Sequence, residues 1–248
     1  MTALTPDTVE PLLRGRFGRP YLWVEECAST QELLRRTDLH EGAVAVTEHQ
    51  TAGRGREGRH WDDTAGRSLL ASVLLHPRPG SPVEQLALVV GLSVAAAIDA
   101  VAGTRAWIKW PNDVLVDDRK VAGILLESTG DTVICGIGVN VNTPEDGLPS
   151  DTRTPAGSLL TATRREHDRA ELLARLLVEL QQRYDEWLDL GLGLFIRELE
   201  QRDALRGVAV QVGDVSGRAA GIAPDGRLRL VIDDGSEILV ASGEVALR

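Results

Sequence analysis

The stretch "TAGRGREGRHW" (residues 51–61) alternates glycines with arginines and ends in a tryptophan. Glycine lets the backbone bend and approach a ligand closely, and arginine offers a planar cation that binds carboxylate or phosphate through paired hydrogen bonds. A β-branched stretch at 43–48 runs into this segment, and connections at strand ends often carry ligand-binding groups. The spacing therefore predicts a loop that holds an anion.

This loop concentrates positive charge on a protein that is acidic as a whole. The formal net charge is −10 and the isoelectric point is near 5.0, which argues against bulk affinity for nucleic acid or for an anionic membrane. Taken alone, the loop is also compatible with a solvated surface segment or with an RGG-like nucleic-acid segment. The loop's place after a strand favours ligand binding, but a second motif is needed to decide.

That second motif is "KWPNDVLV" (109–116). A strand-end turn explains the Pro-Asn-Asp trio, but it does not explain Lys109, a cation in an otherwise apolar strand. Only two of the 27 basic side chains are lysines, Lys109 and Lys120. A half-buried lysine is costly unless it faces an anion, so the sequence favours a functional Lys109. Lys120 lies beside a predicted hairpin tip and is expected to be solvated.

Two other stretches give weaker signals. "GIGVNVN" (136–142) lacks the third glycine of a dinucleotide fingerprint, and its glycines indicate a strand that another backbone or a ligand approaches closely. Asn140 and Asn142 would share one face of that strand. "CASTQE" (27–32) is compatible with a simple helix cap and equally with hydrogen bonds to a small polar head group. The sequence contains no P-loop, no GxSxG elbow and no histidine pair with metal-ligand spacing.

Hydrophobic periodicity and turn residues predict the elements that must position these motifs. Strands are expected at 21–26, 43–48, 68–75, 106–110 and 132–142, with a hairpin over 114–128 whose tip is Asp117-Asp118. Helices are expected at 6–15, after Ser29, at 82–101 and at 166–189, and a further helix is expected to run to 201. The stretch 143–163 is expected to be loop. This pattern favours an α+β fold in which helices flank a mixed β-sheet.

The apolar run 86–98 is expected to be a buried helix, too short to span a bilayer, and the N-terminus has no secretory signal. Cys27 and Cys135 are expected to be small buried thiols in a reducing, cytoplasmic setting. From Gly207 onward, short strands alternate with tight turns, which is typical of a small all-β barrel. We therefore predict two domains, 1–204 and 205–248.

Taken together and in this order, the motifs resemble those of the biotin–protein ligases, also called biotin–[acetyl-CoA-carboxylase] ligases. The resemblance runs from about residue 21 to the C-terminus and includes "STQ" (29–31), "EHQTAGRGREGRHW" (48–61), "KWPNDVLV", "KVAGILLE" (120–127), "GIGVNVN" and the final "GEVALR". It implies a catalytic domain like that of class II synthetases and biotin–lipoate ligases, followed by an SH3-like β-barrel. It also implies the activity: biotin and ATP form biotinyl-5′-AMP and pyrophosphate, and a carrier lysine then takes the biotinyl group.

The resemblance implies the following site residues. For biotin it implies Ser29, Thr30, Gln31, Gln50, Arg54, Gly55, Arg56, Lys109 and Gly123. For ATP and the adenylate it implies Arg54, Arg56, Arg59, Trp61, Lys109, Asn112 and Asn140. Arg54, Arg56 and Lys109 are expected to act in catalysis. Mg²⁺ is expected to accompany ATP, with unknown ligands.

Two positions depart from the family's pattern. The family often has Arg where this chain has Glu57, and Glu57 is expected to face solvent. It often has Asn where this chain has Gln31, which keeps the amide chemistry with a longer reach. Some members repress transcription through an N-terminal winged helix-turn-helix, and the roughly 20 residues before the strand at 21 are too few for one. The resemblance thus predicts a cytoplasmic ligase, monomeric or weakly dimeric, without nucleic-acid or membrane binding, that modifies a biotin carboxyl carrier protein or domain.

Two alternatives stay open at this point. A lipoate or octanoate transferase of similar catalytic fold would need a long apolar acyl pocket, whereas the Ser/Thr/Gln set and the C-terminal barrel favour biotin. A biotin- or nucleotide-sensing regulator would bind ligand without turnover. Titration with biotin and with lipoate, each with ATP, distinguishes a lipoate enzyme from a biotin ligase. Pyrophosphate release that depends on both biotin and ATP distinguishes a ligase from a sensing regulator.

Overall fold

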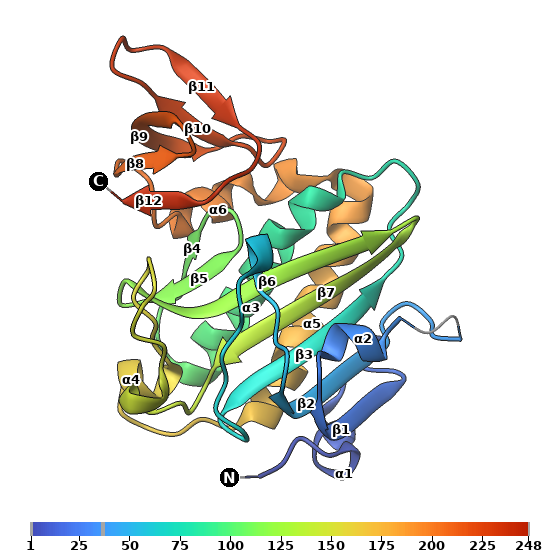
Figure 1. Ribbon diagram of the computed structural model, residues 1–248. Coiled ribbons are helices and arrows are strands. Elements are labelled where there is room, and N and C mark those ends of the chain that lie inside the picture. Colours follow the sequence, from blue (N-terminus) through green and yellow to red (C-terminus); the bar gives the residue numbers. More distant parts are fainter. Residues whose placement is uncertain (1, 36–37, 248) are drawn as a thin grey trace.

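The computed structural model describes residues 2–35 and 38–247, and it contains two β-sheets (Figure 1). The larger sheet has seven strands in the order β1-β2-β3-β7-β6-β5-β4. β1 and β2 are parallel and every other neighbouring pair is antiparallel, so the sheet is mixed, as predicted. Its strands are β1 (Tyr21–Cys27), β2 (Val44–Gln50), β3 (Ser68–Leu75), β4 (Trp107–Lys109), β5 (Asp113–Val116), β6 (Arg119–Thr129) and β7 (Thr132–Asn140).

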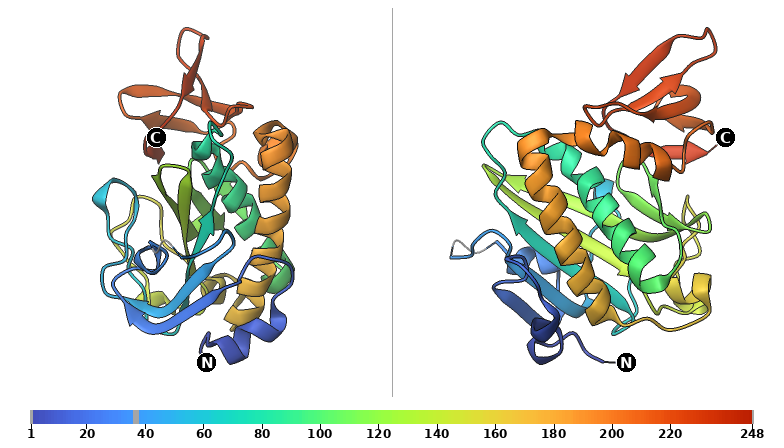
Figure 2. Two further views of the ribbon diagram at one scale, coloured as in Figure 1. Left: turned by 90° about the vertical axis from the view of Figure 1, so that its right-hand side faces the viewer. Right: turned by 180° about the vertical axis from the view of Figure 1, so that it is seen from behind.

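Two long helices cover one face of this sheet. α3 (Leu86–Ala102) and α5 (Arg169–Leu190) run side by side across it and lie in front of the sheet in the right-hand view of Figure 2. α3 is apolar around its whole circumference because it lies between the sheet and α5. The stretch Val83–Ala102, with 20 residues and a mean hydropathy of 2.0, is long and apolar enough to cross a membrane, but it is mostly buried within the protein. The predicted buried helix is confirmed, and the argument that it is too short for a bilayer was wrong.

The shorter helical segments correct several predicted boundaries. The expected helix at 6–15 is α1 (Pro6–Val9) followed by a 3₁₀ turn, η1 (Glu10–Leu12). The expected loop 143–163 ends in α4 (Leu159–Thr163), because the Ser158 and Thr161 side chains cap each other's backbone amides in a capping box. The others are α2 (Thr30–Leu33), η2 (Arg56–Gly58), η3 (Val83–Gln85), η4 (Glu145–Gly147), η5 (Leu192–Phe195) and α6 (Ile196–Arg202).

The second sheet is antiparallel and has the order β11-β10-β9-β8-β12. It consists of β8 (Ala209–Val212), β9 (Val215–Ile222), β10 (Leu228–Val231), β11 (Glu237–Val240) and β12 (Val245–Leu247). Its β9–β10 turn docks on the larger unit, where Trp110 Nε1 donates to the Gly226 carbonyl at 2.9 Å and Gln85 Nε2 donates to the Asp225 carbonyl at 3.2 Å. The predicted all-β C-terminal unit is present, and the boundary at 204/205 stays a prediction.

The open face of the large sheet lies opposite α3 and α5. Figure 2 shows in its left-hand view that the segment around η2 and the segment before α4 stand on this face. Asp117 and Asp118, with φ of 50° and 60°, make the left-handed turn that joins β5 to β6, as predicted for the hairpin tip. The fold therefore leaves one sheet face free and surrounds it with loops.

Candidate active site

A cavity of about 500 Å³ opens on this free sheet face. All thirteen residues that the sequence singled out for ligand contacts line it. They are Ser29, Thr30, Gln31, Gln50, Arg54, Gly55, Arg56, Arg59, Trp61, Lys109, Asn112, Gly123 and Asn140. The loop at residues 51–61, called the Gly/Arg loop below, and the strand before the Pro-Asn-Asp turn (111–113) therefore converge on one cavity.

The Gly/Arg loop has a defined shape. Its two legs pair at the base, where the Trp61 amide donates to the Gly53 carbonyl at 3.0 Å. The backbones of Arg54 and His60 form an antiparallel β-bridge beside this pair. The loop turns at Glu57, whose φ of 57° is rare for a residue other than glycine. The Glu57 side chain is exposed, as predicted. This turn places Arg54 and Arg56 over the cavity.

One end of the cavity is lined by neutral hydrogen-bonding groups. Gln50 Oε1 accepts from the Thr30 amide at 2.9 Å, and the Thr30 and Ser72 hydroxyls share a hydrogen bond of 2.7 Å. Gln31 Nε2 donates to the carbonyls of Leu125 and Ile134, both at 3.3 Å, so its donor group is already engaged. The N-cap Ser29 is buried, and its side chain makes no capping hydrogen bond. This end suits a small neutral polar group.

Cations also line the cavity. Arg56 Nη1 donates to Asn112 Oδ1 at 3.1 Å, which links the Gly/Arg loop directly to the Pro-Asn-Asp turn. Arg54 pairs with Glu127 at 3.0 Å through Nη1, while its buried Nε has no hydrogen-bond partner among the described residues. Asn112 is itself held by its Nδ2, which donates to the Ile124 carbonyl at 2.8 Å. The two motifs form one supported cationic centre.

Lys109 is the most deeply buried of these cations, with 6% of its surface exposed. Its Nζ donates to Thr154 Oγ1 at 2.5 Å and to the Val245 carbonyl at 3.2 Å. Burial lowers the pKa of Lys109, and the nearby Asp113 opposes part of that shift. Its hydrogen-bond acceptors are neutral oxygens and the nearby carboxylate of Asp113 compensates its charge only in part, so Lys109 presents positive charge beside the cavity.

Lys120 also reaches the cavity, which corrects the expectation of a solvated side chain. Its Nζ lies 2.7 Å from Asp113 Oδ1 and 5.8 Å from the centre of the Trp61 ring. A β-bulge causes this: Val114 pairs with Ala122 but Leu115 pairs with Lys120, so one residue of β6 is unpaired and the alternation of side chains shifts. Lys120 and Gly123 are three residues apart, so strict alternation would place them on opposite faces of β6, and the bulge lets both line the cavity.

Trp61 lies directly on the sheet. A Cβ placed on Gly138 would stand 2.5 Å from Trp61 Cε2, and one on Gly123 would stand 3.0 Å from Trp61 Cζ3. Both glycines are therefore needed for close approach to β6 and β7, as the glycine-interrupted strand predicted. The buried Trp61 Nε1 has no hydrogen-bond partner among the described residues.

Asn140 and Asn142, which were predicted to share one face of the strand, have different surroundings. Asn140 lines the cavity, and its Nδ2 donates to the Gly157 carbonyl at 3.0 Å. Asn142 lies beyond the end of β7 and exchanges two hydrogen bonds of 2.9 Å with the backbone of His167. Asn140 thus belongs to the site and Asn142 fixes the loop that leads to α5. Of the two thiols, Cys135 is buried as predicted, whereas Cys27 is only partly buried.

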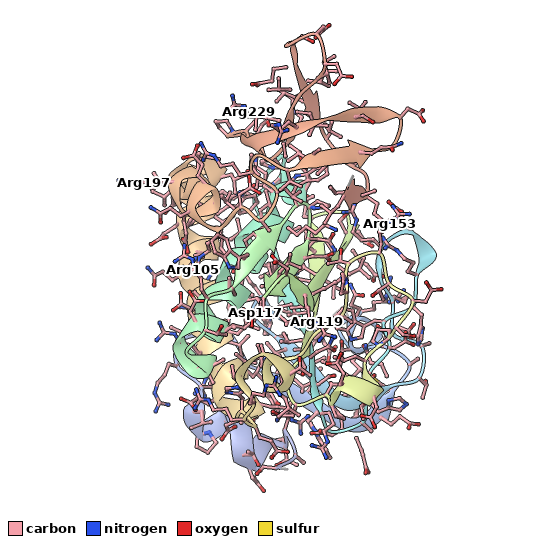
Figure 3. The ribbon with its side chains drawn as sticks, turned by 90° about the vertical axis from the view of Figure 1, so that its left-hand side faces the viewer. Arg105, Asp117, Arg119, Arg153, Arg197 and Arg229 are labelled. Atoms are coloured by element: carbon pink, nitrogen blue, oxygen red, sulfur yellow. The ribbon has the colours of Figure 1, made fainter. Side chains whose placement is uncertain are left out.

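Residues of the C-terminal unit also line the cavity, which the sequence did not predict. Gly243, Glu244 and Val245 line the cavity. Glu244 forms ion pairs with Arg59 and, at 3.0 Å, with Arg153, which Figure 3 labels between the C-terminal sheet and the Gly/Arg loop. Contacts between such distant segments cannot be read from local patterns. In the described ranges 2–35 and 38–247, no group of three or more His, Cys, Asp or Glu side chains is arranged to hold a metal ion.

Comparisons with known proteins agree with this geometry. Residues 24–142 match the biotin/lipoate A/B protein ligase family, and residues 206–248 match the biotin protein ligase C-terminal domain. The chain is 36% identical to a biotin–[acetyl-CoA-carboxylase] ligase of Mycobacterium tuberculosis, over 83% of this chain and 79% of that protein. It is 33% identical to a bifunctional ligase/repressor of Bacillus spizizenii, over 88% and 71% of the two chains.

Solved structures give the same result. The biotin protein ligase of Aquifex aeolicus in complex with biotin and ATP superposes with a TM-score of 0.83 at 33% identity, over 92% of this chain and 97% of that chain. The structure of the same protein without these ligands gives a TM-score of 0.79.

Proposed function

This chain belongs to the biotin protein ligase family, and we propose that, as a biotin–[acetyl-CoA-carboxylase] ligase, it activates biotin with ATP and transfers it to a carrier lysine. The observation that carries this proposal is the convergence of Arg54, Arg56, Lys109 and Lys120 on one cavity with a neutral polar end. The acceptor is expected to be a biotin carboxyl carrier protein or domain.

The first step joins two anions. A biotin carboxylate oxygen attacks the α-phosphorus of ATP, a P–O bond forms, and pyrophosphate leaves. Two unit charges about 4 Å apart repel by roughly 4 kcal/mol at an effective dielectric constant near 20. Fixed cations that face the meeting point offset this repulsion and stabilise the charge that develops in the transition state. The second step breaks the acyl–phosphate bond when the lysine amine attacks the acyl carbon and AMP leaves.

The cavity suggests how the ligands lie. We assign the biotin ring to the neutral end formed by Ser29, Thr30, Gln31 and Gln50, and the carboxylate and α-phosphate to the cations between the Gly/Arg loop and β4–β6. Gly123 would allow close approach to β6. Arg59, Trp61, Asn112 and Asn140 remain candidates for the nucleotide side. Mg²⁺ would enter with the ATP phosphates, since this ion commonly binds through substrate phosphates and few carboxylates.

Pyrophosphate release tests the function. The protein should release pyrophosphate only when biotin and ATP are both present, and titration should detect biotin binding. Lipoate in place of biotin should give neither heat nor turnover. Tight lipoate binding without biotin binding would make the chain a lipoate enzyme, and biotin binding without pyrophosphate release would make it a sensor.

Arg56→Gly is expected to shorten the lifetime of enzyme-bound biotinyl-5′-AMP at least about tenfold while it changes the biotin Kd less than about threefold. The guanidinium is linked to Asn112 across the cavity and would leave the phosphate less enclosed when removed; a hydrogen bond to a charged group is worth ~1.5–3 kcal/mol. Rapid filtration of the labelled intermediate measures this lifetime.

The matched control is Glu57→Gly, because the φ of 57° at this exposed position suits glycine. It should leave the lifetime unchanged. Equal loss in both variants would mean that loop flexibility, not the Arg56 charge, governs retention.

A further inference from the structure

A buried carboxylate stands at the base of the Gly/Arg loop. The Asp63 side chain has no exposed surface, and it accepts hydrogen bonds from two consecutive residues at the end of β2. His49 Nδ1 lies 2.7 Å from Asp63 Oδ1, and the Gln50 amide donates to Asp63 Oδ2 at 3.0 Å. Both carboxylate oxygens are therefore engaged, and Asp63 joins the end of β2 to the far leg of the loop, two residues after Trp61.

The same connection fixes the orientation of a cavity side chain. Gln50 Oε1 accepts from the Thr30 amide at 2.9 Å and from the Thr30 hydroxyl at 3.3 Å. Since the oxygen is held by Thr30, Gln50 offers its Nε2 as a donor to a ligand in the cavity. The Gln50 backbone is held at the same time by Asp63. Gln50 thus connects two sets of hydrogen bonds: its backbone amide is held by Asp63, and its side-chain oxygen is held by Thr30, whose hydroxyl also contacts Ser72.

We propose that Asp63, held in place by His49, is a positioning residue: it fixes the backbone of Gln50, and with it the place of the Gln50 side-chain amide, and thereby sets the affinity of the cavity for biotin. The inference rests on the proposed function, because it assigns the ureido oxygen of biotin to Gln50 Nε2. Asp63 does not itself line the cavity. A hydrogen bond to a charged acceptor is shorter and stronger than one between neutral groups, so the carboxylate holds the strand end more firmly than a neutral side chain can.

The neighbouring Asp62 shows what an ordinary surface carboxylate looks like here. Its side chain lines the cavity but is 63% exposed, and its one ion pair among the described residues is a 3.7 Å contact with the exposed His60. Asp62 thus has none of the hydrogen bonds that Asp63 makes to the end of β2. Asp62→Ala is therefore the control for Asp63→Ala, because it removes a neighbouring carboxylate from the cavity without touching the end of β2.

The test is isothermal titration of biotin, without ATP, into the full chain and its variants. Asp63→Ala should weaken biotin binding about tenfold, and His49→Ala should weaken it about threefold because Asp63 loses one of its two donors. Asp62→Ala should bind biotin normally. In the pyrophosphate assay, Asp63→Ala should raise the KM for biotin by the same factor and leave the KM for ATP within twofold.

A double-mutant cycle separates positioning from general destabilisation. If Asp63 acts through Gln50, adding Asp63→Ala to a Gln50→Ala protein should cost no further biotin affinity. Additive losses would overturn the proposal, and so would unchanged biotin affinity in Asp63→Ala. If Asp63→Ala does not fold, the same cycle with His49→Ala decides, and wild-type affinity in His49→Ala sinks the inference. Absence of biotin binding to the wild-type chain would instead refute the proposed function.

Discussion

Lys109→Met is expected to lower the rate of biotin- and ATP-dependent pyrophosphate release at least about 100-fold, the size of effect seen when one preorganised charge is removed from an active site. Methionine keeps the length and much of the volume of the side chain but removes the ammonium. Because Lys109 is buried and its hydrogen-bond acceptors are the neutral oxygens of Thr154 and Val245, its charge is available to an incoming anion. Single-turnover measurement of adenylate formation checks the prediction.

The same substitution should raise the thermal midpoint. Burial lowers the pKa of Lys109, which means that the folded state binds this proton less tightly than the unfolded state does. The charged lysine therefore destabilises the fold below its folded pKa, and this penalty disappears as the pH rises towards the unfolded value. The gain in Lys109→Met should be full at neutral pH and should shrink in alkaline solution.

Activity should show the matching alkaline decline. If the ammonium is required, kcat/KM falls as the pH rises through the lowered pKa of Lys109, and Lys109→Arg should move that decline to higher pH because guanidinium stays charged. Arg105→Met, which removes a cation four residues earlier that contacts Trp107 and lies outside the cavity, is the control and should change the rate less than twofold. A normal rate in Lys109→Met would remove Lys109 from the mechanism.

Local patterns were sufficient for much of the sheet and for the cationic centre. The short, largely apolar stretch 68–75 gave β3 with its bounds as a buried strand, and Asp117-Asp118 identified the β5–β6 turn. The Gly/Arg loop and the Pro-Asn-Asp turn each follow strands of the same sheet, and so both reach its free face. The unusual lysine in an apolar strand indicated Lys109 because burial without an anion is costly in any fold.

Other features depend on relations that sequence patterns do not contain. Lys120 was assigned to solvent because it lies beside a hairpin tip, and the local pattern gives no hint of the bulge that turns it into the cavity. Glu244 and Val245 reach the site only because the C-terminal sheet docks on Trp110. The capping box that starts α4 depends on Ser158 and Thr161 inside a stretch whose Pro, Asp, Thr and Gly content predicts loop.

Arg169→Met is expected to lower the free energy of unfolding by ~3–5 kcal/mol, the range for breaking one partner of a buried ion pair. The Arg169 side chain is 3% exposed, and its Nη1 lies 2.8 Å from Glu48 Oε2. It also donates to the carbonyls of Ser68 and Thr2, both at 2.9 Å, and Glu48 holds the Leu4 amide. Removal leaves the Glu48 carboxylate buried without its cation, and the N-terminal segment loses its anchor at Thr2. For a domain of this size the thermal midpoint should fall by about 10 °C.

Arg175→Met on the same helix is the control. Arg175 is half exposed and pairs with Glu179 one turn away, an interaction worth at most ~0.5 kcal/mol. Glu48→Leu combined with Arg169→Met should cost less than the sum of the two single changes, because neither charge is then left alone; additive losses would contradict a direct pair.

The buried pair should govern stability without governing ligand affinity. Glu48 directly precedes His49 and Gln50, but the end of β2 stays aligned with β1 through the Glu26–His49 and Cys27–Gln50 pairs. Below its thermal transition, Arg169→Met should therefore bind biotin within about threefold of the wild type. A large loss of biotin affinity in the folded variant would show that Arg169 and Glu48 position the cavity, and that the polar end of the site extends deeper into the protein than Asp63.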